Sequence, residues 1–403
     1  MTTLHMGSKT WVLLNSDRVV NEIFTKRAGL THERPYYPIA SGLVSNDKRL
    51  FVQRTKDWIK GRRLVHQVMN GAASVNQGTI AETESVKLLG AYLDHPELWY
   101  KHHYRYTASI MHQIILSEPL VRSTEELDTL QKVTSSFLGS INSTMVDFFP
   151  QLTLLPRFLQ WWRPQWAAVG QWHLDTFILW WKIIKSRVTS TDAPPSFVRD
   201  NILSPKNYEG DDRDAMFLTT SIMAAGSDNP RMTINAFVMA CISAPEAMQK
   251  AREEADRVCG GSAERLPSLA DMASMPYTCA VVKEVLRWRP TVPLIPQHQL
   301  VEDLDFMGYH FPAGTDFLVN SVPVCTNGYD TPLEFQPERW LEGGGSRNGI
   351  AQDLWAFAFG GGRRVCVGYK LAQKELFVAY ARLLYCFEYF PVSVPLRQMI
   401  ILK

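Results

Sequence analysis

The sequence predicts a mainly helical protein of the α+β class, folded as a single domain over residues 1–403. Two observations lead to this prediction. Most of the chain carries apolar residues at helical spacing, in segments long enough for several turns each. A single β-rich stretch, residues 291–325, comes late in the chain and surrounds a proline–glycine turn. Helices kept apart from a smaller group of strands are typical of the α+β class.

The first third of the chain predicts one strand followed by helices. Residues 10–15 (TWVLLN) have the composition of a strand, and Ser16 or Asp17 can cap a short helix that ends near Gly29. Residues 30–57 are rich in proline, tyrosine, glycine and asparagine, which predicts a long loop. Helical patterns then cover residues 58–69, 79–117 and 124–146.

Tryptophan is concentrated in residues 147–185, which hold six of the twelve in the chain. The simplest interpretation is a packed pair of helices. The alternative is a lid that touches a membrane or a hydrophobic substrate, because aromatic side chains commonly line apolar pockets. The six are Trp161, Trp162, Trp166, Trp172, Trp180 and Trp181.

Residues 190–212 predict a connection between helices, because proline, aspartate and serine recur in them. A long, largely apolar helix is then predicted from about Asp214 to Ser243. Ser243 and Glu246 have the spacing of a capping box for the next helix, which Gly260 is expected to end.

The last third predicts strands between helices. Residues 277–289 form a helical pattern that Pro290 stops, and another helical pattern follows Cys366. Residues 312–314 (PAG) predict a turn between strands. The β-rich pieces are Leu300–Tyr309 and Asp316–Val319, and the end of the chain is strand-like over Val392–Leu402.

Composition excludes several classes of protein. The chain holds 42 Lys plus Arg and 40 Asp plus Glu, a formal net charge of +2, without a basic stripe, so no nucleic acid is expected as a partner. None of the six cysteines forms a C-x-x-C pair and no Cys/His spacing suits zinc, which is typical of reduced thiols in an intracellular protein. No stretch approaches the ~20 apolar residues of a membrane-spanning helix.

The most informative segment is 359–368 (FGGGRRVCVG), which places Cys366 in a glycine-rich loop just before a helical pattern. Glycines let a backbone approach a flat cofactor closely, and amide groups at a helix start favour a thiolate. A thiolate on haem iron favours cleavage of the O–O bond. The alternative interpretation is a buried structural cysteine beside a flexible turn.

This segment resembles the haem-binding motif F-x-x-G-x-R-x-C-x-G of the cytochrome P450 family at every fixed position. The resemblance implies the cytochrome P450 fold, in which the haem lies between two long helices. It makes Cys366 the axial ligand of the iron of haem b, with Gly362 and Arg364 as cofactor-binding residues. Phe359 would shield the sulfur from water, and an ordinary core phenylalanine is the alternative.

Two further family positions suit the haem propionates. Trp58 and Arg62 lie four residues apart and match W-x-x-x-R, and an indole N–H and a guanidinium are suitable donors for a carboxylate. Arg364 and His298 match positions with the same role. For His298, an ordinary histidine in a strand is the alternative.

Glu284 and Arg287 lie three residues apart, so both side chains share one helical face. Surface pairs of this kind are common and weak. The family, however, joins its E-x-x-R to the arginine of a later P-E-R, which is Arg339 here, as a buried salt link. The resemblance makes these three residues structural, needed for haem incorporation rather than for chemistry.

Residues 225–230 (AGSDNP) resemble the family's oxygen-binding sequence A-G-x-D-T-T. The resemblance assigns catalytic roles to Gly226, which lets the helix pass close to the haem, to Asp228, which relays protons, and to Asn229. Asn229 stands where the family has the threonine that stabilises dioxygen. Pro230 cannot donate to the carbonyl of Gly226, so a kink is predicted there.

The resemblance implies a haem-dependent monooxygenase that inserts one oxygen atom of O2 into a small hydrophobic substrate. Short segments of the sequence resemble filamentous-fungal members of the family, and this favours a role in secondary metabolism. No flavin or dinucleotide motif is present in the sequence, so electrons would come from NADPH through a separate NADPH–cytochrome P450 reductase. The alternatives are a catalytically inactive haem-binding protein and a haem-thiolate enzyme of oxidative coupling or isomerisation.

Eukaryotic members of the family begin with a membrane anchor and end with a hairpin that lines the substrate pocket. Both are expected to be missing, so the chain is predicted to be truncated at both ends. The resemblance also implies an intracellular place at the surface of the endoplasmic reticulum. Five cations could give a docking face for the reductase, although scattered solvated charges are an equal alternative. They are Arg62, Arg63, Arg363, Lys370 and Lys374.

Overall fold

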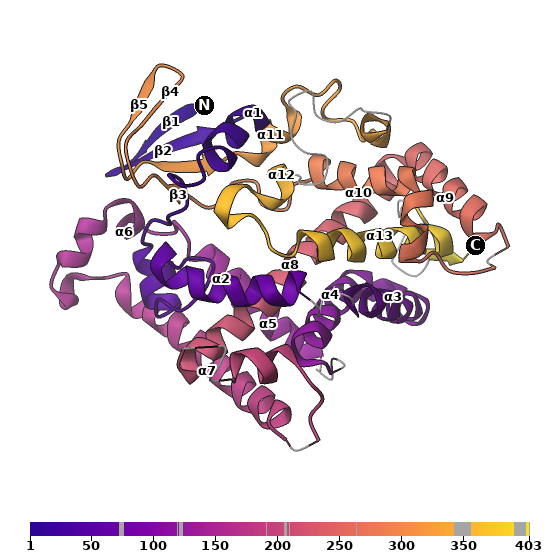
Figure 1. The fold of residues 1–403 in the computed structure, drawn as a ribbon, viewed down its shortest axis with the longest axis horizontal. Helices are drawn as coiled ribbons and strands as arrows, with labels where there is room; N and C mark the ends of the chain where they lie inside the picture. The colour runs from indigo at the N-terminus through magenta and orange to yellow at the C-terminus, as the bar shows by residue number, and fades with distance from the viewer. Residues whose placement is uncertain are drawn as a thin grey trace.

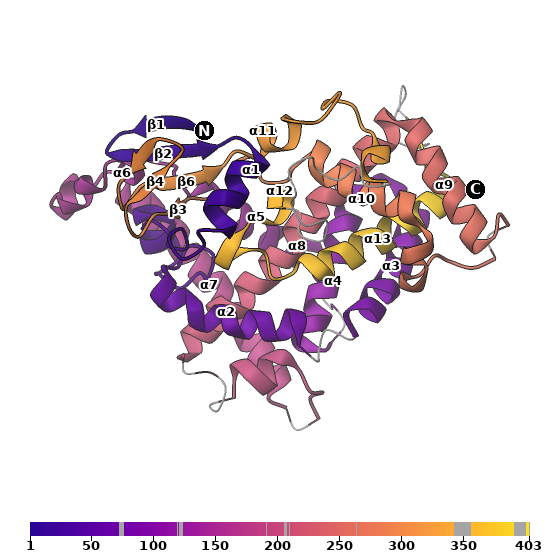
Figure 2. The ribbon, with the colours of Figure 1, turned by 45° about the horizontal axis from the view of Figure 1, so that its top comes forward.

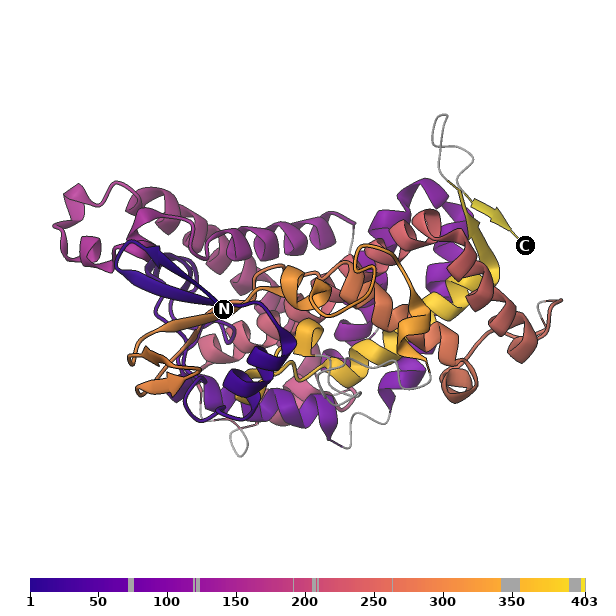
Figure 3. The same cartoon turned by 90° about the horizontal axis from the view of Figure 1, so that it is seen from above.

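The computed structural model describes residues 1–71, 76–118, 120, 124–190, 192–204, 208, 210–262, 264–341, 356–390 and 400–402. A helical body makes up most of the molecule, and a small sheet lies at one side of it (Figure 1). The N-terminus lies by the sheet, whereas the C-terminal strand lies at the opposite end (Figure 3). The mainly helical α+β class is therefore confirmed.

The sheet joins the start of the chain to a late segment. Its strand order is β1-β2-β6-β3, with β2 antiparallel to β1 and parallel to β6. The predicted strand at 10–15 is confirmed as β2, and Trp11 pairs with Asp316 of β6. The four strands are β1 (Thr2–Met6), β2 (Lys9–Leu14), β3 (His298–Gln299) and β6 (Asp316–Val319).

Two antiparallel pairs complete the strands. The predicted β-rich piece 300–309 overlaps a hairpin over residues 304–311, because Met307 and Gly308 both take positive φ values, 53° and 79°, and reverse the chain in two residues. Of the predicted C-terminal strand, residues 400–402 pair with 387–389, and residues 391–399 lie outside the described residues. The pairs are β4 (Leu304–Phe306) with β5 (Tyr309–Phe311), and β7 (Phe387–Tyr389) with β8 (Ile400–Leu402).

Thirteen α-helices are described, along with short π-helical and 3-10 segments labelled η. The α-helices are α1 (Asp17–Val20), α2 (Thr55–Asn70), α3 (Gln77–Asp94), α4 (Trp99–Leu116), α5 (Thr124–Gly139), α6 (Met145–Phe148), α7 (Arg163–Val188), α8 (Asp212–Ser243), α9 (Pro245–Cys259), α10 (Pro276–Trp288), α11 (Ser321–Thr326), α12 (Ala356–Phe359) and α13 (Tyr369–Cys386). The η segments are η1 (Asn21–Thr25), η2 (Pro38–Val44), η4 (Pro96–Leu98), η5 (Pro150–Leu154), η6 (Arg157–Leu159), η7 (Val198–Ile202), η8 (Leu269–Ser274), η9 (Pro337–Trp340) and η10 (Gly362–Arg364).

Prolines account for two differences from the predicted elements. The pattern at 79–117 splits into α3 and α4, because Pro96 has no amide hydrogen to continue α3 and begins η4. The predicted loop 30–57 contains η2, which Pro38 begins with its fixed φ.

Two local predictions are wrong. Residues 147–185 do not form a helical pair, because prolines confine the first part to the short segments η5 and η6, and the single long helix α7 follows. Ser243 does not cap the next helix. It is the last residue of α8, and α9 begins with Ala244 as cap and Pro245 in its first turn, without a side-chain capping bond.

Helix α8 forms the centre of the helical body. It is buried along most of its length and packs against α4, α5, α7, α10 and α13. Figure 2 shows α8 in the middle of the molecule, with α13 beside it. The rings of Phe237 and Tyr380 stack with centroids 4.0 Å apart and join the two helices. Among the described residues, none of the helices combines the length and hydropathy that crossing a membrane requires.

Candidate haem-binding site

The loop around Cys366 is built on close backbone contacts. Gly360 and Gly362 take φ values of 72° and 64°, a region that side chains other than glycine rarely adopt. A Cβ on Gly362 would come within 2.0 Å of the carbonyl oxygen of Phe24, so only glycine fits there. The backbone N–H of Cys366 donates to the carbonyl of Phe359 at 2.9 Å and closes the loop. The loop is thus fixed against η1 on one side.

The Cys366 side chain is accessible, yet protein atoms surround it closely enough to affect its ionisation. Desolvation raises the pKa of its thiol, while the backbone N–H of Gly368 and the charge of Arg62 act to lower it. The protein alone therefore keeps the sulfur largely protonated at neutral pH. A coordinated metal ion removes such a proton outright, which is the condition under which this cysteine becomes a thiolate.

Helix α2 is fastened to the cysteine loop. Arg62 donates from Nη2 to the carbonyl of Val365, and Asn70 donates to the carbonyl of Val367 at 3.3 Å. The guanidinium carbons of Arg62 and Arg364 lie 5.5 and 4.3 Å from the ring of Trp58. Trp58 and both arginines, which the sequence predicts as propionate donors, are therefore brought together beside the loop.

Arg364 is held by the N-terminal part of the chain. It donates from Nε to the carbonyl of His32 at 2.6 Å and from Nη2 to that of Gln53 at 3.0 Å. Desolvation, with the nearby charge of Arg34, lowers the pKa of Arg364 to about 9. Among the described residues neither Arg62 nor Arg364 forms an ion pair with a carboxylate, and two such guanidinium groups favour an anionic ligand between them.

His298 is buried in β3 and stacks on Phe24 with ring centroids 4.1 Å apart. Its Nδ1 lies 2.8 Å from the carbonyl of Thr31, so Nδ1 carries the proton and donates. Desolvation and the charge of Arg34 hold the pKa of His298 well below its usual value. A neutral ring of this tautomer has a bare Nε2, which cannot donate to a propionate, so Arg62 and Arg364 are the better donors.

Two residues of helix α8 are exposed where their neighbours are buried. Ala225 and Asn229, one turn apart, are exposed although most of the surrounding helix is buried. Gly226 faces α4, where a Cβ would come within 2.3 Å of Sδ of Met111. The glycine therefore permits close packing of α8 on α4. The helix remains helical through Pro230, and a kink at that position stays a prediction.

Asp228 is engaged in a buried ion pair. Its Oδ1 accepts from Nη2 of Arg231 at 2.7 Å, and both side chains are only 6% exposed. Arg231 also donates to the hydroxyl of Tyr100 in α4 at 2.6 Å. Asp228 is thus turned toward α4 while Asn229 is exposed. Sequence reasoning missed Arg231, although its spacing of three residues from an acid is the usual one for a helical ion pair.

The predicted salt link is present. Glu284, which is fully buried, accepts from Arg287 at 2.7 and 2.8 Å and from Nε of Arg339 at 3.1 Å. Trp340 and the backbone N–H of Gln336 donate to the same carboxylate, at 2.8 and 2.9 Å. The motif did not predict the last two donors. With them, the buried carboxylate accepts hydrogen bonds from protein groups on both oxygens and needs no water.

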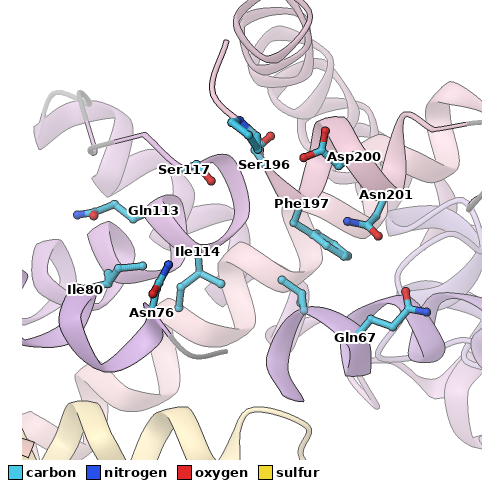
Figure 4. A pocket seen from close by; sticks show the side chains of 12 residues that line it. Gln67, Asn76, Ile80, Gln113, Ile114, Ser117, Ser196, Phe197, Asp200 and Asn201 are labelled. Carbon is cyan, nitrogen blue, oxygen red and sulfur yellow. The ribbon is translucent and has the colours of Figure 1, made fainter. Parts of the chain in front are cut away.

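Two cavities lie apart from these residues. One, of about 430 Å³, opens between α2, α4 and η7, and its lining includes Gln67, Gln113, Phe197 and Asn201 (Figure 4). Another, of about 520 Å³, lies between α3, α4 and α5. Neither is lined by residues of 225–230 or 359–368, so neither belongs to the cysteine site.

The residues present fit a haem-thiolate cofactor. An accessible cysteine stands in a loop held by glycine geometry, and the two guanidinium groups beside it have no carboxylate partner in the part of the chain that the structure describes. Phe359 is half-buried next to the loop and lies near the ring of Tyr369. A metal ion bound to the sulfur and acidic groups bound to Arg62 and Arg364 would satisfy this donor set.

Comparison with known proteins gives the same result. The profile of the family described as Cytochrome P450 matches residues 1–400. Cytochrome P450 monooxygenase virE of Hypocrea virens is 28% identical, over 96% of this chain and 72% of that protein. Cytochrome P450 monooxygenase atE of Aspergillus terreus is 29% identical, over 94% and 73%.

A zebrafish cytochrome P450, solved with abiraterone, has the same fold. Its TM-score is 0.74 at 20% identity, and the match covers 100% of this chain and 93% of that one. The Cys366 loop, its attachment to α2 and the salt link behind it thus occur in a chain that matches one family almost from end to end. This chain belongs to the cytochrome P450 family, and it is a haem-thiolate monooxygenase.

Proposed function

We propose that this monooxygenase acts on a small hydrophobic organic compound, a fungal secondary metabolite, and takes its electrons from NADPH through a separate reductase. The observation that carries the proposal is the intact cysteine loop, fastened to α2 and to η1. The fungal relatives named as monooxygenases support the choice of reaction. We also propose that residues 1–403 act as one domain.

The proposed cofactor is haem b, which when bound through Cys366 supplies the chemistry of reductive O–O cleavage. Arg62, Arg364 and Trp58 would hold its propionates, with His298 behind them. The remaining proposed contacts are those of Phe359, which would exclude water from the sulfur, and Gly362, whose approach to η1 sets the loop.

In this proposal, Asp228 and Asn229 of α8 have different roles. Asp228 stays paired with Arg231 and keeps α8 against α4 through Tyr100, and Gly226 allows that close packing. Asn229, exposed on α8, would place its amide where a proton or a water is needed. The amide can both donate and accept, which suits it to hold a water in place of a threonine hydroxyl.

We expect Asn229→Ala to reduce the coupling of NADPH consumption to product about 10-fold, since one positioned proton-handling group contributes at least that much. The measurement is the ratio of product formed to NADPH consumed, with peroxide as the escaping product. Asn201→Ala, at the separate 430 Å³ cavity, is the matched control. Unchanged coupling in Asn229→Ala would remove Asn229 from the mechanism.

The proposed reductase would dock on the side of the cysteine loop, where Arg63, Arg363 and Lys370 are exposed. Opposite charges steer such encounters, and salt screens them. The rate of haem reduction by the reductase should therefore fall steeply as ionic strength rises. A rate independent of salt would contradict docking through these charges.

We propose contact with the surface of the endoplasmic reticulum through residues 154–161. Leu154 and Phe158 are each 84% exposed and Trp161 is 65% exposed, with Arg157 among them. Exposed aromatic and aliphatic side chains beside a cation suit the interface of an anionic bilayer. Binding to phosphatidylserine vesicles should weaken when Phe158 and Trp161 are both changed to serine, and equal binding would exclude this contact.

Turnover with labelled dioxygen tests the proposed reaction. With NADPH and reductase, one labelled oxygen atom should enter each product molecule, for a substrate found by its spectral shift. Product formed without NADPH would instead identify an isomerase, and oxidised product without label would identify oxidative coupling. A protein that holds haem but gives no product with any binding compound would be the inactive form.

A further inference from the structure

Arg49 is a buried cation between η2 and α2. Its side chain is 3% exposed, and its guanidinium carbon lies 4.1 Å from the ring of Phe137 in α5 and 4.9 Å from that of Phe177 in α7. Aromatic faces attract a cation but supply no hydrogen-bond acceptor in the plane of the guanidinium. Among the described residues, no carboxylate forms an ion pair with Arg49.

Every other buried arginine among the described residues donates to at least one oxygen atom. Arg287 and Arg231 donate to carboxylates, and Arg34, Arg252 and Arg382 donate to backbone carbonyls. Arg49 differs, because within the described residues the only hydrogen bond of its guanidinium is with a nitrogen. Nε of Arg34 is also buried without a partner, but its guanidinium has two carbonyl acceptors, whereas that of Arg49 has no oxygen acceptor among the described residues.

The contact with His173 defines which groups are left unpaired. Nη2 of Arg49 lies 3.3 Å from Nδ1 of His173, which is fully buried in α7. A guanidinium only donates, so Nδ1 accepts and the imidazole proton is on Nε2. Both Nε2 of His173 and Nε of Arg49 are buried without a partner. Each of these nitrogens is a donor that lacks an acceptor.

Burial determines the charge state of both side chains. Burial and the charge of Arg49 hold the pKa of His173 at about 3, so the ring stays neutral. Burial alone lowers the pKa of Arg49 to about 9, which leaves it charged at neutral pH. A buried, unpaired charge is among the costliest features a fold can hold.

We propose that Arg49 and His173 form a binding site for one small monoanion, a carboxylate or a halide ion, at the junction of η2, α5 and α7. An acceptor with negative charge would pair with Nε of Arg49 and neutralise the buried guanidinium. The site lies near α8, the helix that carries Asn229. Leu50, the neighbour of Arg49 in the chain, and Leu218 of α8 both lie against Gly61 of α2. The anion is therefore either a free ion or the acidic group of a bound organic molecule.

Thermal unfolding of the haem-loaded protein tests the site without requiring turnover. In chloride-free HEPES buffer, sodium chloride and sodium acetate are titrated into the wild type, Arg49→Met and Arg54→Met. Arg54 lies in the same loop with its side chain 59% exposed, so it controls for the loss of one charge and for ionic strength. The unfolding midpoint of the wild type and of Arg54→Met should rise by about 3 °C at 100-fold the dissociation constant.

Arg49→Met should lack this saturating rise. In anion-free buffer it should be as stable as the wild type or more stable, because a buried unpaired charge is replaced by an apolar side chain of similar length. A response to chloride identifies a free ion as sufficient, whereas a response to acetate alone identifies an organic acid. Equal responses of the wild type and Arg49→Met to both salts would overturn the proposal.

Crystals of the wild type provide a second test that needs no variant. Soaking in sodium bromide or in sodium acetate should place an anion within hydrogen-bond distance of Nε of Arg49, with bromide located by its anomalous signal. Absence of both anions from this position would overturn the proposal, even if Arg49→Met failed to fold.

Discussion

Replacing Cys366 with serine is expected to abolish monooxygenase activity and the long-wavelength Soret band of the reduced carbonyl complex. Serine keeps the size and polarity of the side chain, but its hydroxyl does not ionise as a thiol does when it meets a metal ion. The loss in turnover should exceed 1,000-fold, roughly the effect of removing a group on which every later step depends. The measurement combines the difference spectrum with turnover of the same preparation.

Cys279→Ser is the control for this substitution. Cys279 is half-buried in the contact between α10 and η8, and its thiol donates to the carbonyl of Met272 at 3.5 Å. That bond can be kept by a serine hydroxyl, so both the spectrum and turnover should be preserved. A normal long-wavelength band in Cys366→Ser would contradict the assignment of the axial ligand.

Changing Glu284 to glutamine is expected to cost about 3–5 kcal/mol of the free energy of unfolding, because two buried guanidinium groups lose their counter-charge. The side chain of Arg287 is fully buried and that of Arg339 is 10% exposed, so water cannot replace the carboxylate. Native proteins are stable by only about 5–15 kcal/mol in total. The variant should therefore accumulate as a protein with little haem.

Glu338→Gln is the matched control, since Glu338 forms an exposed ion pair with Lys250 at 2.6 Å. Exposed pairs contribute about 0–1 kcal/mol, so this variant should keep its haem content. Urea unfolding of both variants, together with the ratio of haem to protein, measures the difference. Equal losses in the two variants would show that the buried link has no special role.

The sequence was most informative where side-chain chemistry and helical spacing coincide. The helix at 277–289 and the long helix from 214 are confirmed by α10 and α8, and Gly260 ends α9 with a φ of 94° as its position predicted. The turn at 312–314 is also confirmed, by the bond from Thr315 to Pro312. Each of these rests on a short-range rule that tertiary contacts do not override.

Predictions failed where two local rules compete. Ser243 and Glu246 satisfy the capping pattern, but Pro245 fixes its own φ and moves the helix start by one residue. The tryptophans of 147–185 indicated packing but not which segments are helical. Strand β1 was not predicted, because its residues are mostly exposed and only pairing with β2 fixes it.

In the site, too, local motifs were predictive and contacts between distant elements were not. The family motifs predicted Cys366 and the three members of the salt link. They did not predict that Asp228 is occupied by Arg231, nor that the tautomer of His298 leaves it without a free donor, because both depend on contacts between distant elements.

The most direct test of the central claim is the carbon-monoxide difference spectrum of the reduced protein, expressed from this chain with a haem precursor. The structure predicts the long-wavelength Soret band, since Cys366 is accessible in a loop fixed by η1 and α2. A band only at the shorter wavelength, or no bound haem, would contradict the account, because the thiolate site would then not assemble.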